Sequence, residues 1–88
     1  MTTNVTDDGF GAKPQPITEA EFLEQLNILP PMGWAIVNGV EGFTSPEPYD
    51  FNTHWRFIRI GAQCWKILAS PRLTITELAV QCRRTQGN

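Results

Sequence analysis

A two-residue turn between two apolar segments limits what this chain can fold into more than any other feature. Asn38-Gly39 separates the apolar segment 34–37 from the segment 40–43. Asparagine and glycine adopt the positive φ angles that a type I′ turn requires, and this turn joins neighbouring antiparallel strands. The chain is therefore expected to contain an antiparallel hairpin over residues 34–43.

A second hairpin is predicted over residues 54–68. The segments 54–60 and 63–68 are rich in Trp, Phe and Ile, and Gly61-Ala62 between them suits a tight turn that begins with glycine. Residues 45–50, Ser-Pro-Glu-Pro-Tyr-Asp, connect the two hairpins. Because proline cannot donate to a sheet ladder, this connection is predicted to be a loop.

The residues around Thr18 contain the start signals of a first helix. Thr18 can cap it and Glu21 can return a hydrogen bond, which together form a capping box. Ile17 and Phe22 stand at the positions of a hydrophobic staple. Pro30-Pro31 cannot continue a helix, so a helix of about ten residues is predicted between these signals.

Residues 73–78 contain the same start signals for a second helix. Thr74 and Glu77 form another capping box, and Leu73 and Leu78 form another staple. Gly87 is a plausible end. The apolar stripe of the predicted helix consists of Ile75, Leu78, Ala79 and Cys82.

These elements predict an α+β fold in the order α-β-β-β-β-α. It consists of a small antiparallel sheet of three to four strands flanked by an N-terminal and a C-terminal helix. Packing both helices on one face of the sheet is the simplest way to bury the apolar stripes. Residues 1–16 are polar and rich in proline and glycine, and are predicted to be a flexible tail. Residues 17–86 form the single domain.

The turn at Gly61-Ala62 also assigns side chains to faces, because alternate residues of a strand point to opposite sides. One face is predicted to carry Arg56, Ile58, Ile60, Trp65 and Ile67, and the other to carry Trp55, Phe57, Arg59, Cys64, Lys66 and Leu68. The first face is the better core. The second is half aromatic and half basic, so that it is either exposed or covered by another segment.

Few residues of this chain suit catalysis or metal binding. His54 is the only histidine, and Cys64 and Cys82 stand 18 residues apart with no Cys-x-x-Cys pair. A zinc site needs four clustered ligands, and a nucleophile needs an oriented base. We therefore predict no enzyme activity, no metal and no cofactor. The cysteines are predicted to be buried free thiols, with a disulfide as the alternative.

The net charge of −2 is unevenly distributed. Residues 1–53 contain eight acidic residues and one lysine, a net charge of −7, whereas residues 54–88 contain six basic residues and one acidic residue, a net charge of +5. Such a division either marks two charged faces or disappears when the halves pack together.

The mixed face suggests a binding surface of one of two kinds. Aromatic and basic side chains together can stack on and neutralise a nucleic acid, or anchor a protein partner. The sequence pI of about 5.2 favours a protein. The acidic residues of the first helix are candidates for the same role toward a basic partner. The candidate partner-binding residues are Trp55, Phe57, Arg59, Lys66, Glu19, Glu21 and Glu24.

Residues 18–68 resemble small plasmid- and phage-borne bacterial proteins of unknown function. The residues that match are Phe22, Leu26, Leu29-Pro30-Pro31, Trp34, Gly39, Glu41, Phe43, Glu47, Arg59-Ile60-Gly61 and Trp65. The resemblance implies a mobile-element context and, by analogy, an anti-CRISPR type of inhibitor. The expected partner is then a bacterial protein or ribonucleoprotein complex in the host cytoplasm. We expect no small-molecule substrate and no membrane insertion, since no apolar run approaches the ~20 residues of a membrane span.

Overall fold

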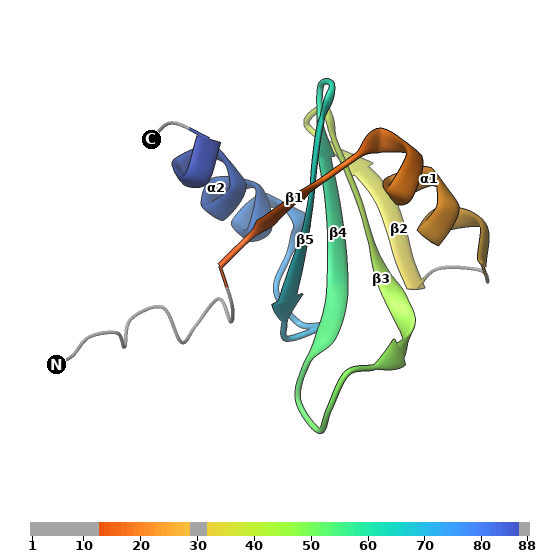
Figure 1. Ribbon diagram of the computed structural model, residues 1–88. Helices are drawn as coiled ribbons and strands as arrows, with labels where there is room; N and C mark the ends of the chain where they lie inside the picture. The colour runs from red at the N-terminus through yellow and green to blue at the C-terminus, as the bar shows by residue number, and fades with distance from the viewer. Residues whose placement is uncertain (1–12, 29–31, 87–88) are drawn as a thin grey trace, which may run out of the picture.

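The computed structural model describes residues 13–28 and 32–86 of the chain (Figure 1). Along the chain the elements are β1 (Gln15–Ile17), α1 (Glu19–Ile28), β2 (Met32–Val37), β3 (Val40–Pro48), β4 (His54–Ile60), β5 (Gln63–Ala69) and α2 (Ile75–Gln86). The strands form one antiparallel sheet in the order β1-β5-β4-β3-β2. The α+β class, the two helices and the two hairpins are confirmed.

Both predicted turns have the backbone geometry that their residues suggested. Asn38 and Gly39 have φ angles of 51° and 82°, as a type I′ turn requires, and Val37 pairs with Val40. Gly61 has a φ angle of 62°, and Ile60 pairs with Gln63 across it. The face assignments that depended on this second turn are therefore correct.

Both threonine caps form, but among the described residues only the second has the return bond of a capping box. Thr18 Oγ1 accepts a hydrogen bond from the Glu21 N–H at 3.0 Å. Thr74 Oγ1 accepts one from the Glu77 N–H at 3.0 Å, and Glu77 returns the bond by accepting from the Thr74 N–H at 2.8 Å. The predicted end of the first helix at Pro30-Pro31 lies outside the described residues; α1 extends to Ile28.

The placement of both helices on one face was wrong. The two helices lie over opposite faces of the sheet, because both faces carry buried apolar side chains. On one face, α2 packs on a cluster that includes Ile58, Trp65 and Ile67. On the other, Phe22 of α1 packs with Phe43, Phe57 and Cys64.

Two boundaries differ from the prediction. The segment 45–50 was expected to be a loop, but β3 continues to Pro48, which pairs with His54. A register shift between Thr44 and Pro48 accommodates the prolines, since an irregular ladder does not need their missing N–H groups.

The predicted tail is the second difference. Gln15 and Pro16 belong to a fifth strand, β1, that pairs with β5 at the sheet edge, where a proline is tolerated. Of the rest of the predicted tail, residues 13–14 are described and belong to no helix or strand, and residues 1–12 lie outside the described residues.

Candidate functional site

The predicted aromatic–basic face exists, but α1 covers its centre. Phe57 is only 3% exposed. Its ring stacks on Phe43 with centroids 4.9 Å apart, and Phe43 meets the edge of the Phe22 ring at 5.2 Å. Phe57 is thus a core residue, and a partner cannot reach it while α1 stays in place.

Arg59 is held between two carboxylates. Its Nη2 donates to Glu41 Oε1 at 2.7 Å, and its Nη1 donates to Glu19 Oε2 at 2.8 Å. The guanidinium also lies over the Phe22 ring at 5.0 Å. The hydrogen bond with Glu41 is the main cause of the raised pKa of Arg59. Arg59, in β4, thus links α1 to the sheet through its ion pair with Glu19.

Lys66 is occupied in a similar way. Its Nζ lies 3.7 Å from Glu21 Oε2 and 4.7 Å from the centroid of the Trp55 ring. Glu24 is exposed and forms no ion pair within the described residues. The structure therefore brings Arg59 and Lys66 together with Glu19 and Glu21, so that these candidates neutralise one another across the α1–sheet contact.

A different group of side chains, most of them exposed, gathers where two loops meet. The connection between β3 and β4 and the connection between β5 and α2 lie at the same end of the sheet, the lower end in Figure 1. We call this surface the loop end and define it by Tyr49, Phe51, Asn52, His54, Ser70, Pro71 and Arg72.

The β3–β4 loop is held in one shape by Asp50. Its Oδ1 accepts hydrogen bonds from the Asn52 N–H at 2.9 Å, from the Thr53 N–H at 3.1 Å and from Thr53 Oγ1 at 2.9 Å. These bonds, that of the Asn52 N–H foremost, lower the pKa of Asp50. The Tyr49 N–H also donates to the Thr53 carbonyl at 2.9 Å. The loop is therefore internally bonded.

Its aromatic side chains differ in their contacts. Tyr49 is 59% exposed and meets the edge of the Trp55 ring, with centroids 6.0 Å apart. Phe51 is 95% exposed. The Phe51 ring is thus available to a partner, on a loop that its own hydrogen bonds hold in shape.

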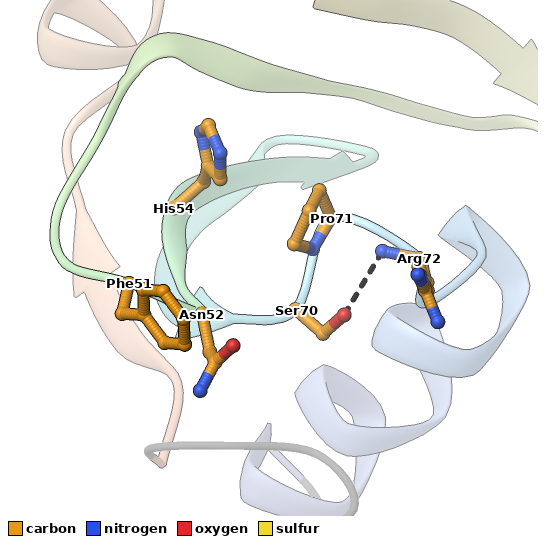
Figure 2. A pocket seen from close by; sticks show the side chains of 6 residues that line it. All are labelled: Phe51, Asn52, His54, Ser70, Pro71 and Arg72. Atoms are coloured by element: carbon orange, nitrogen blue, oxygen red, sulfur yellow. Dashed lines mark hydrogen bonds between the residues drawn. The ribbon is translucent and has the colours of Figure 1, made fainter.

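Beside Phe51 lies a hollow of about 430 Å³ (Figure 2). It is lined by Phe51, Asn52, His54, Ser70, Pro71 and Arg72. His54 has its Nδ1 within 3.0 Å of the Ser45 carbonyl oxygen, so that Nδ1 carries the hydrogen. The Arg72 N–H donates to Ser70 Oγ at 3.1 Å, the contact drawn in Figure 2. The hollow thus has an aromatic side and a basic side.

A buried arginine lies behind this hollow. Arg56 is 5% exposed, and its Nη1 donates to the Ser70 carbonyl at 2.7 Å. Burial lowers the pKa of Arg56. Within the described part of the chain, neither Arg56 nor Arg72 forms an ion pair with a carboxylate. Among the described residues, no carboxylate therefore neutralises the positive charge near the hollow.

The residues of the loop end are not among the partner-binding candidates predicted from the sequence. Tyr49 and Phe51 flank Asp50, and aspartate two or three residues before Asn or Thr is a signal for a loop that is bonded to its own backbone. That signal was available, but it does not reveal that the Phe51 ring stays in solvent.

The two thiols are free and buried, as predicted. Cys64, in β5, packs under α1, and Cys82, in α2, packs against the opposite face of the sheet, so the sheet separates them. Burial raises the pKa of Cys82 to about 12, and burial also raises the pKa of Cys64. Neither thiol is placed as a nucleophile, which needs an ionised and accessible sulfur.

The described residues contain neither a metal-binding cluster nor a membrane-spanning helix. These residues contain no group of three or more His, Cys, Asp or Glu side chains that could hold a metal ion. Neither of their helices has the length and apolar character needed to cross a membrane.

Comparison with known proteins adds no relative. No protein-family model, no curated protein and no solved structure matches this chain significantly.

Proposed function

We propose that this protein acts by binding another protein through its loop end, and that it is an inhibitor rather than a catalyst. The observation that carries the proposal is Phe51, which is 95% exposed on a loop that the Asp50 carboxylate holds together. Burying a phenylalanine side chain is worth roughly 1.5–3 kcal/mol. Because the loop is already ordered, little conformational entropy is lost when a partner covers the ring.

The surroundings of Phe51 support the same proposal. Aromatic and arginine side chains beside a hollow are typical of the residues that contribute most to protein–protein affinity. Here the hollow of about 430 Å³ can receive one or two side chains of the partner. Arg72 at its rim and Arg56 behind it favour a partner segment that offers a carboxylate next to an apolar group.

The partner class comes from the resemblance to plasmid- and phage-borne proteins. We propose that the partner is a CRISPR effector complex of the bacterial host, and that binding blocks it in the host cytoplasm. The nucleic-acid alternative is less favoured, since Arg59 and Lys66 lie against the carboxylates of Glu19, Glu41 and Glu21. A nucleic acid would have to displace these carboxylates.

The experiment measures binding to purified effector complexes of several subtypes by biolayer interferometry, together with a phage plaquing assay. The wild-type protein is expected to bind one subtype and to restore plaquing. Phe51→Ala and Arg72→Ala should each weaken binding by roughly 30-fold, the loss that defines a residue important for affinity.

Val80→Ala is the matched control, because Val80 is a 40% exposed apolar side chain on α2, outside the loop end. It should bind as the wild type does. Absence of both binding and plaquing rescue across the subtypes would reject the anti-CRISPR proposal. Binding that is unchanged in Phe51→Ala and Arg72→Ala would reject the loop end as the interface.

A further inference from the structure

Three large apolar side chains are exposed where α1 lies nearest to the β2 edge of the sheet. They are Leu23 of α1, which is 40% exposed, and Trp34 and Ile36 of β2, which are 49% and 60% exposed. β2 is the outermost strand on this side. We call these three side chains the α1–β2 patch.

The contacts of Glu41 place both β2 side chains on the face that α1 covers. Ile36 pairs with Glu41, and Glu41 pairs with Arg59, whose guanidinium lies against α1. Directly paired residues point to the same side of a sheet. Trp34 lies in the irregular part of β2, but its Nε1 donates to Glu41 Oε2 at 2.8 Å. This hydrogen bond brings the Trp34 ring to the same face.

The ion pairs of α1 show that Leu23 faces the β2 edge. Glu19 precedes Leu23 by one helical turn, so the two side chains lie on the same side of α1. Glu19 reaches Arg59 of β4, whereas Glu21, on the other side of the helix, reaches Lys66 of β5. Because the strands follow one another as β5-β4-β3-β2, the Leu23 side of α1 is the side toward β2.

The charges around the patch are negative on balance. Glu19 and Glu41 share the single guanidinium of Arg59, so these three side chains together keep one negative charge. Glu24, next to Leu23 in the chain, is exposed and has no ion pair among the described residues. β2 itself contains no charged residue. An apolar surface beside such carboxylates is complementary to a segment that combines basic and apolar side chains.

We propose that the α1–β2 patch binds a partner protein through a segment in which a lysine or arginine stands next to an apolar side chain. The apolar side chain of the partner covers Trp34 and Ile36. Its cation meets the carboxylates of Glu19 and Glu24, which lie on either side of Leu23. The proposal does not depend on the proposed function, because it uses no residue of the loop end and requires a partner segment of the opposite charge.

The Trp34 ring is prepared for burial under such a segment. Its Nε1 is already bonded to Glu41 of its own chain, so the polar group of the indole keeps its partner when the ring is covered. The same hydrogen bond restricts the side chain before binding, so that little rotamer entropy is lost. Trp34 is therefore the anchor of the patch.

Fluorescence anisotropy with labelled synthetic peptides of equal length tests the proposal. One peptide alternates leucine with lysine, a second alternates leucine with glutamate, and a third alternates serine with lysine. The leucine–lysine peptide is expected to bind with a Kd below about 1 mM, and the other two at least about 10-fold more weakly. Trp34→Ala should weaken binding of the leucine–lysine peptide by about 10-fold and Glu24→Gln by about 3-fold.

Two variants outside the patch are the controls. Phe51→Ala at the loop end and Val80→Ala on α2 replace exposed apolar side chains and should bind the leucine–lysine peptide as the wild type does. A wild type that does not bind this peptide at up to about 1 mM, or a Trp34→Ala variant that binds it unchanged, would overturn the proposal. So would an NMR signal of the Trp34 Nε1–H that shifts with protein concentration alone, because a second copy would then occupy the patch.

Discussion

Asp50 illustrates how one side chain can shape a surface. The β3–β4 loop contains few residues that could hold it by packing, since Phe51 is in solvent and Tyr49 is half exposed. The three hydrogen bonds to Asp50 Oδ1 replace packing as the source of order. The position of the Phe51 ring therefore depends on the ionisation of a neighbouring carboxyl group.

The order of the loop should consequently depend on pH. The pKa of Asp50 in the folded loop is below the ordinary value of 3.8, so the folded loop binds the proton more weakly than the unfolded chain does. The stabilisation is present above pH 3.8 and is lost as the pH falls through the lower value of the folded loop. NMR signals of the Asn52 and Thr53 amides should move toward disordered values as the pH is lowered below 3.8.

Asp50→Asn is the control for this titration, because it keeps an acceptor oxygen and removes the ionisable group. Its loop signals should not respond to acid over the same range. The interpretation fails if the variant and the wild type show the same pH dependence.

At the scale of elements, the contact between α2 and the sheet depends on a missing side chain. Gly42 in β3 lies under α2. A Cβ atom there would stand 3.0 Å from Ile58 Cδ1 and 3.0 Å from Ile75 Cγ1. Glycine thus lets Ile75, the first residue of α2, approach the sheet closely.

Gly42→Val is expected to lower the free energy of unfolding by about 1–3 kcal/mol, the usual cost of overpacking a core. Ile75→Ala alone should lower it by about 2–5 kcal/mol. The double variant should lose less than the two single losses together, by about 0.5–3 kcal/mol, since the new side chain fills the space that Ile75 leaves. Urea denaturation measures all three, and strict additivity would contradict the close approach of Ile75 to Gly42.

At the scale of the whole molecule, the uneven distribution of charge along the sequence reflects ion pairs between the two halves of the chain. The three ion pairs of the described residues each join an acidic residue of the first half to a basic residue of the second. They connect Glu19 and Glu41 to Arg59, and Glu21 to Lys66. The charge asymmetry along the chain therefore produces cohesion between its halves rather than two separate charged faces.

The wild-type protein should accordingly give no gel shift with mixed DNA and RNA oligonucleotides at ~50 mM salt. Glu19→Gln with Glu21→Gln removes two of the carboxylates and should produce weak binding that falls steeply as salt rises. Glu24→Gln, which removes an exposed acid that has no ion pair among the described residues, is the control. Salt-sensitive binding by the wild type would support the nucleic-acid alternative instead.

Features that depend on residues close together in the chain could be predicted from the amino-acid sequence. The φ angles of Asn38 and Gly61, the caps at Thr18 and Thr74 and the alternation along 54–68 involve groups within a few bonds or within one hairpin. Contacts between such groups form independently of the rest of the chain. The hairpins, the helix starts and the face assignments could therefore be predicted.

Which segment covers each face, and which side chains stay in solvent, depends on contacts between distant parts of the chain. The pairing of β1 with β5, the seating of α1 by the contact of Arg59 with Glu19 and the exposure of Phe51 depend on residues far apart in the chain, or on the absence of any neighbour. Local sequence patterns do not reveal such contacts. Phe57 and Phe51 are the same residue type, yet the first is buried and the second is exposed. The candidate site in the structure is therefore the loop end and not the predicted aromatic–basic face.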